Sequence, residues 1–215
     1  MKKSLRRGVA AAVVAGAALT TGVAVAVSEK PEPPTPPSDR PGYGYSKVRR
    51  GVPDSAERFT VTSPDVGDGE ALPADTWADA FGCTGDNRQL RLLWSGAPQA
   101  TRSYAITMFD PDAPTGAGFW HWLVWDIPAG HTGVDTQLPA DAITGIGDSG
   151  KAGYLGPCPP GGDLTHHYEI TVYALDVPTL GLPASTPPTV AAFTMSGHIL
   201  GYARITGTAT RPRVA

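Results

Sequence analysis

Beyond residue 30, glycine and proline interrupt this sequence too often to permit a long helix. The chain holds 26 glycines and 22 prolines among 215 residues, about twice their usual share of roughly 12%. Glycine adopts left-handed backbone angles and proline fixes φ, so both residues favour turns. This composition argues against a helical bundle or a coiled coil and favours short strands joined by many connections.

The N-terminal segment differs in composition from the rest of the chain. Four basic residues, at positions 2, 3, 6 and 7, precede an uncharged run rich in alanine and valine over 8–27. Small residues at positions 24 and 26 are typical of a signal-peptidase site, so we predict a signal peptide over 1–26. The run is also about long enough to cross a bilayer, and an uncleaved membrane anchor is the alternative.

Residues 27–54 are predicted to be a proline-rich, disordered linker, followed by one folded domain over 55–215. Six prolines lie between positions 31 and 41, with almost no apolar residues that could form a core. Cleavage after residue 26 would leave 13 basic and 20 acidic residues, a net charge of −7. This charge argues against a nucleic-acid partner.

The remaining sequence predicts an all-β domain. Segments rich in aromatic and β-branched residues, bounded by turn residues, predict strands at 59–63, 90–94, 103–110, 121–127, 167–175 and 202–208. Residues 190–200 are the one segment that resembles a helix, with Pro188 near its first turn. The order of these elements predicts an antiparallel β-sandwich with a short C-terminal helix.

Three polar residues occupy positions where apolar residues are expected. Asp110, His121 and His166 each fall in the alternation phase of the bulky apolar residues of their own strand, His166 by counting back from 168. Burying such groups without partners costs a few kcal/mol each. Each alone could be a satisfied core or capping group. Together, beside the stiff turn 110–114 and the proline-rich loop 156–162, they indicate a polar pocket.

An ordered set of motifs resembles the phosphatidylethanolamine-binding protein (PEBP) family, also called the Raf kinase inhibitor-like family, in its bacterial branch. The motifs are Asp110-Pro111-Asp112-Ala113-Pro114, Phe119-Trp120-His121-Trp122, Gly156-Pro157-Cys158-Pro159-Pro160, His166-His167-Tyr168, Thr171-Val172-Tyr173-Ala174-Leu175-Asp176 and Gly197-His198-Ile199-Leu200. They follow the family order over residues 57–210 and so cover essentially the whole domain.

This resemblance implies a Greek-key β-sandwich with a small pocket that accepts phosphate, phosphoryl head groups or other anions. A histidine can donate a hydrogen bond to a phosphate oxygen, most strongly when protonated. The expected ligand-binding residues are Asp110, Asp112, Trp120, His121, Gly156, Pro157, Pro159 and His166. One departure is that Gln89-Leu90 replace the Ser-Pro that usually follows the family's Gly-Asp-Asn-Arg pattern, so the rim near Asn87 is expected to differ.

Cys83 and Cys158 are the only cysteines. In an exported protein a disulfide between them is expected, and two separate free thiols are the alternative. A bridge would tie the pocket-rim loop to the segment that precedes Leu90.

We therefore expect a secreted or cell-surface, monomeric binding protein that performs no chemistry and needs no metal or cofactor. Its partner would be a phosphorylated or anionic small ligand, such as a phospholipid head group. One alternative is a metal-assisted hydrolase that uses Asp110, His121 and His166. Against it, the sequence has no HExxH spacing and no separate general base. The other alternative is a surface module that inhibits an extracellular enzyme.

Overall fold

A computed structural model describes residues 51–213 of the chain. The predicted signal peptide and nearly all of the predicted linker lie outside the described residues. Within the described part, no helix is both long enough and apolar enough to cross a membrane.

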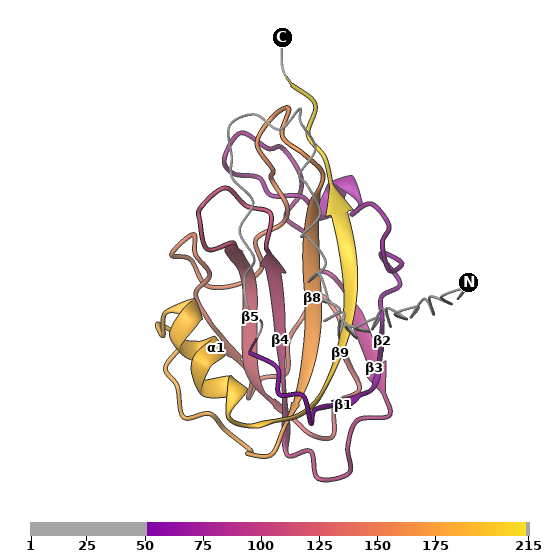
Figure 1. The fold of residues 1–215 in the computed structure, drawn as a ribbon, viewed down its shortest axis with the longest axis vertical. Coiled ribbons are helices and arrows are strands. Elements are labelled where there is room, and N and C mark those ends of the chain that lie inside the picture. The colour runs from indigo at the N-terminus through magenta and orange to yellow at the C-terminus, as the bar shows by residue number, and fades with distance from the viewer. Residues whose placement is uncertain (1–50, 214–215) are drawn as a thin grey trace, which may run out of the picture. The chain divides into compact units, whose positions relative to one another are not determined.

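Two β-sheets and one short helix make up the described domain (Figure 1). The larger sheet has the strand order β1-β9-β8-β4-β5-β7, and the smaller has the order β2-β3-β6. The strands of the larger sheet are β1 (Glu57–Arg58), β4 (Ser103–Asp110), β5 (Phe119–Pro128), β7 (Ile143–Thr144), β8 (His166–Leu175) and β9 (Ile199–Ala209). The other elements are β2 (Thr60–Thr62), the 3-10 helix η1 (Ala74–Thr76), β3 (Leu92–Ser95), β6 (Gly133–Val134) and α1 (Pro188–Ser196).

The larger sheet contains the Greek-key arrangement that the family resemblance implies. Strands β4, β5 and β7 are antiparallel neighbours, and β8 returns to pair with the free side of β4. The resulting order β8-β4-β5-β7 is that of a Greek key. The pairing is antiparallel between all named strands except at one edge of this sheet, where the two-residue strand β1 runs parallel to β9.

Both faces of the larger sheet are covered, which explains why its central strands are apolar on both sides. One apolar cluster lies between the two sheets and includes Ile106, Trp122 and Ile170. A second cluster packs Trp125 on the opposite face, with Met195 of α1. The helix ends earlier than predicted, at Ser196, because Gly197 follows it and residues 199–200 already belong to β9.

The predicted disulfide between Cys83 and Cys158 is confirmed. It joins residues 75 positions apart, and it links the loop before β3 to the loop that precedes β8. A covalent link across so long a segment restricts the unfolded chain strongly.

We expect a variant with both Cys83→Ser and Cys158→Ser to unfold at lower denaturant than the wild type. Because the bridge removes the entropy of closing a long loop in the unfolded chain, the loss of unfolding free energy should reach as much as about 4 kcal/mol. Guanidinium denaturation followed by tryptophan fluorescence would measure it. Equal midpoints for the two proteins would show that the bridge does not stabilise the domain.

Candidate functional site

A cavity of about 170 Å³ lies where β4 ends and where β5 and β8 begin. Antiparallel pairing brings these three strand ends to the same edge of the sheet, so Asp110, His121 and His166 meet there although they are far apart in sequence. The cavity is lined by Phe81, Asp110, Ala113, Pro114, Thr115, Phe119, His121, Leu155, Gly156, Cys158, Pro159, Pro160, His166 and Tyr168. A few polar groups therefore face a space with mostly apolar walls.

His166 is held between two carboxylates. Its Nδ1 lies 2.7 Å from Oδ2 of Asp110, and its Nε2 lies 3.3 Å from Oδ2 of Asp163. All three side chains are almost completely buried. Burial alone would lower the pKa of His166, but the hydrogen bonds and charges of the two carboxylates outweigh it and raise the pKa. The two acidic neighbours therefore favour the protonated form of the His166 ring.

His121 reaches the cavity because β5 contains a bulge. Phe109 pairs with Trp120, whereas Met108 pairs with Trp122, so His121 has no partner on β4. Such a bulge redirects side chains and is common beside functional sites. The alternation argument assigned His121 to the face of Leu123, which packs in the cluster under α1. The alternation argument correctly predicted that His121 is buried but assigned it to the wrong face of the sheet, because it took no account of the bulge, which turns the ring toward the cavity.

The imidazole of His121 is neutral at neutral pH. Burial lowers its pKa to about 4, although the charge of Asp110 acts in the opposite direction. Its Nδ1 lies 3.1 Å from the carbonyl oxygen of Leu155. A carbonyl can only accept a hydrogen bond, so the proton of the neutral ring sits on Nδ1. This leaves Nε2 as the ring nitrogen available to a ligand.

Tyr168 lines the cavity and carries a buried hydroxyl group. The residue is fully buried and lines the cavity, and its hydroxyl finds no hydrogen-bond partner among residues 51–213. Burial, followed by the charge of Asp110 and by the close approach of its side chain, raises the pKa of Tyr168, and the nearby backbone of Cys158 acts in the opposite direction, so the group stays protonated. An unpartnered buried hydroxyl costs free energy, and a ligand oxygen in the cavity would remove that cost.

The rim is closed by Asn87, despite the departure from the family pattern at Gln89-Leu90. The Asn87 amide donates to the carbonyl of Tyr154 at 2.9 Å and accepts from the backbone N–H of Gly156 at 2.8 Å. The Cβ of any other residue at position 156 would lie about 2.0 Å from the Thr76 carbonyl oxygen. Glycine is therefore required at this position.

Of the eight expected ligand-binding residues, five line the cavity: Asp110, His121, Gly156, Pro159 and His166. Asp112, Trp120 and Pro157 do not. The Asp112 carboxylate instead accepts hydrogen bonds from the backbone N–H and the ring Nδ1 of His167. The Trp120 ring packs on Phe109, with 4.5 Å between ring centroids. These residues therefore support the walls rather than contact the cavity.

Sequence reasoning missed Asp163, Tyr168 and Phe81. Asp163 stands three residues before His166, and this spacing could have indicated a partner for the ring. Tyr168 falls in the apolar phase of its strand, so alternation alone predicted a core residue and not a residue with a hydroxyl group near the cavity. Phe81 lies far from the other motifs in sequence, and its loop is held at the cavity by the disulfide at Cys83 and by hydrogen bonds from Arg211.

The geometry does not favour the metal-assisted hydrolase. Both ring nitrogens of His166 are already engaged by carboxylates, so His166 could bind a metal only by breaking one of these bonds. Within residues 51–213, no group of three or more histidine, cysteine or acidic side chains is arranged to hold a metal ion.

Comparison with known proteins agrees with the motifs. Residues 62–210 match the family model described as phosphatidylethanolamine-binding protein. The chain is 40% identical over 159 residues to the UPF0098 protein YbcL of Escherichia coli K12, which covers 70% of this chain and 87% of that protein. It is 37% identical over 155 residues to the putative lipoprotein LppC of Mycobacterium tuberculosis H37Rv, which covers 72% of this chain and 73% of that protein.

A similar structure has been solved. The crystal structure of E. coli YbcL, presented as a new member of the mammalian PEBP family, aligns with this chain at a TM-score of 0.69 and 38% identity. The alignment covers 71% of this chain and 98% of that chain.

The lowered pKa of His121 predicts that protonation of this residue destabilises the folded domain at acid pH. Between pH 6.5 and about 4 the unfolded chain binds a proton at His121 and the folded chain does not, so the unfolding free energy falls as the pH falls. His121→Asn keeps a donor for the Leu155 carbonyl and does not titrate. From pH 7 to pH 4, we expect the wild type to lose about 3 kcal/mol relative to this variant.

Urea denaturation of both proteins at several pH values would measure this difference. The raised pKa of His166 acts in the opposite direction, but it is present in both proteins and cancels in the comparison. Parallel pH profiles would contradict the assignment of His121 as a buried neutral group.

Proposed function

The chain belongs to the phosphatidylethanolamine-binding protein family, and from that premise we propose that its cavity binds a phosphoryl group or a similar small anionic head group. The protein would act by binding, as a monomer and without a cofactor, rather than by catalysing a reaction. The observation that carries this proposal is the cavity itself, which is lined by His121 and by Tyr168, whose buried hydroxyl has no hydrogen-bond partner in the described chain.

Charges around the cavity favour a ligand that brings a positive charge or a proton with it. Two acidic side chains, those of Asp110 and Asp163, enclose the single imidazole ring of His166, so acidic groups outnumber the basic ring that they contact. A phosphate oxygen near His121 would raise the pKa of the ring, and the proton taken up would become a charge-assisted donor. A zwitterion such as phosphoethanolamine could also place its ammonium group near Asp110.

Three observations support export of the protein. A disulfide is typical of proteins outside the reducing cytosol. The N-terminal sequence has the composition of a signal peptide. The related M. tuberculosis protein is named a putative lipoprotein. We therefore place the proposed binding activity at the cell surface or in the medium.

Titration calorimetry with inorganic phosphate and with phosphoethanolamine tests the proposal. We expect binding to the wild type, with proton uptake at pH 6–7 because His121 becomes charged in the complex. His121→Asn should weaken binding at least tenfold. His198→Asn is the matched control, because His198 pairs with Asp176 at the surface and does not line the cavity.

No binding of either ligand to the wild type would overturn the proposal, as would stoichiometric zinc in protein purified without chelators.

Tyr168→Phe separates ligand binding from stability. Because the Tyr168 hydroxyl has no hydrogen-bond partner among the residues that the structure describes, its removal should leave the unfolding free energy unchanged or raise it by up to about 1 kcal/mol. Phosphate affinity should nevertheless fall about fivefold to tenfold. Calorimetry and chemical denaturation of the same preparation would measure both quantities.

Tyr154→Phe provides the opposite control. The Tyr154 hydroxyl donates to the Thr76 carbonyl at 3.1 Å, so its loss should cost about 1 kcal/mol of stability and leave phosphate binding unchanged. If Tyr168→Phe behaved in the same way, the Tyr168 hydroxyl would be a structural group and not a ligand donor.

A further inference from the structure

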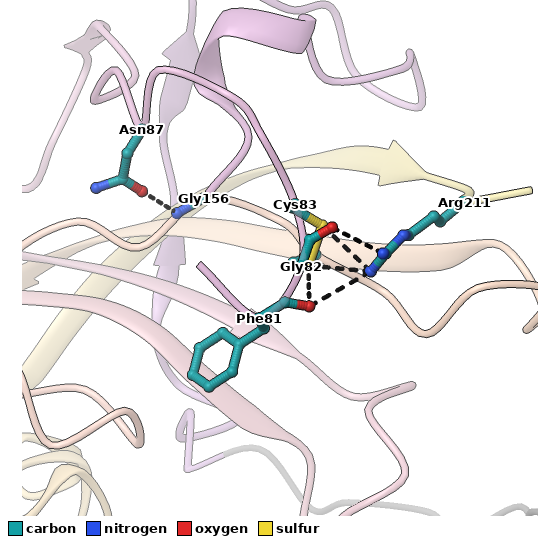
Figure 2. Close-up of a disulfide and its surroundings, with 7 residues drawn as sticks. Phe81, Gly82, Cys83, Asn87, Gly156 and Arg211 are labelled. Atoms are coloured by element: carbon teal, nitrogen blue, oxygen red, sulfur yellow. Dashed lines mark hydrogen bonds between the residues drawn. A yellow bond between two sulfur atoms is a disulfide. The ribbon is translucent and has the colours of Figure 1, made fainter. Parts of the chain in front are cut away.

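The loop at positions 81–83 carries one half of the disulfide (Figure 2). Phe81 of this loop is exposed at its outer side and lines the mouth of the cavity. We propose that the Cys83–Cys158 disulfide is a reducible latch that holds Phe81 at this mouth, and that Arg211 makes the latch easy to reduce. The effect of the latch on ligand release rests on the proposed function. Its redox behaviour does not.

Phe81 is held in place by its surroundings rather than by its own packing. It lines the cavity, yet 67% of the residue is exposed to solvent. Its φ of 55° lies in the left-handed region, and the φ of Gly82, at 80°, continues that turn. A bulky residue in this region costs roughly 1–2 kcal/mol. Phe81 would therefore leave this conformation if the restraints on the loop were removed.

Two restraints act on this loop. One is the covalent bond from Cys83 to Cys158 in the rim loop. The other is Arg211, whose Nη2 donates to the Gly82 carbonyl at 2.7 Å and whose Nη1 reaches the Phe81 carbonyl at 3.5 Å. In Figure 2 the guanidinium of Arg211 points at these carbonyls and at the disulfide from the end of β9.

Arg211 also places a positive charge beside both sulfur atoms. Its Nη1 lies 3.6 Å from Sγ of Cys83 and 3.6 Å from Sγ of Cys158. Its backbone carbonyl accepts a hydrogen bond from the N–H of Gly162 at 2.8 Å. This second contact fixes Arg211 to the rim loop, so the cation stays near the sulfurs after the bridge opens.

A cation at this distance stabilises the thiolate that leaves when a disulfide is attacked. The reductant would be a dithiol, either a small molecule or a protein. One of its thiolates attacks a sulfur of the bridge, forms a mixed disulfide and displaces a cysteine thiolate beside Arg211. The second thiol of the reductant then attacks the mixed disulfide. The protein gains two electrons and two protons, and the reductant leaves as a disulfide.

Opening the latch removes a wall of the cavity. With the bridge intact, Phe81 and Cys158 both contribute to the lining. After reduction, Phe81 is free to leave the left-handed conformation, and a bound head group loses its contact on that side. The oxidised protein would retain its ligand, and the reduced protein would release it faster.

The redox part is tested by equilibrating the protein with dithiothreitol mixtures and counting alkylated cysteines by mass spectrometry. Arg211→Gln keeps a donor for the Gly82 carbonyl but removes the charge, so its bridge should be about tenfold harder to reduce, a shift of about 30 mV to more reducing potential. Arg213→Gln is the matched control, because Arg213 belongs to the same tail and lies beside Gly162. Equal midpoints for the wild type and both variants would overturn the role of Arg211.

The effect of the latch on the loop at positions 81–83 is tested by hydrogen exchange of the oxidised and the reduced wild type. We expect exchange at residues 80–84 to speed up after reduction through local opening, while β4 and β8 speed up only as far as the lower free energy of global unfolding requires. No faster exchange at 80–84, or the same change in exchange free energy there as in β4 and β8, would show that the bridge is not a latch for this loop.

Ligand release is then measured by stopped flow with phosphoethanolamine. Reduction should speed dissociation at least tenfold. Phe81→Asn tolerates the left-handed conformation but lacks the ring, so it should release the ligand quickly in both redox states. Unchanged dissociation after reduction would overturn the effect on the ligand. If the oxidised wild type bound no ligand at all, the proposed function would fail, while the midpoints and the exchange pattern would still decide the latch.

Discussion

The hydrogen bond between Asp110 and His166 is the interaction on which the site depends. It joins the end of β4 to the start of β8 at 2.7 Å, deep inside the protein. A buried carboxylate or imidazolium alone would be costly, but each satisfies the other, and Asp163 completes the set. Because both ring nitrogens of His166 are engaged, His121 and Tyr168 are left to meet the phosphoryl end of a ligand. The residues that hold the strand ends together, Asp110, Asp163 and His166, thus differ from the residues proposed to bind the ligand, His121 and Tyr168.

Much of the fold follows from sequence, because its causes are local. Aromatic and β-branched runs marked β4, β5 and β8, and Pro188 marked the start of α1. Pairing partners were not local, so the parallel contact of β1 with β9 could not be predicted. The family resemblance, rather than periodicity, supplied the Greek-key order. Alternation was least informative in the central strands, where both faces are buried.

The candidate site was predictable where a residue carried an unusual chemical group in a buried strand. Asp110, His121 and His166 were found in this way. Asp112 and Trp120 were misplaced because adjacent residues in a motif point in different directions. Phe81 escaped because its place at the cavity depends on a bond between cysteines 75 positions apart.

Because of the bulge at His121, the ligand site could change in evolution while the fold of the sandwich is kept. The extra residue contributes no pair to the ladder between β4 and β5, so a one-residue deletion there would restore regular pairing and leave the sheet intact. The same deletion would remove an imidazole from the cavity in a single step. A gene of this lineage could therefore lose or exchange its ligand while its product kept folding, and relatives that share this architecture need not share a ligand.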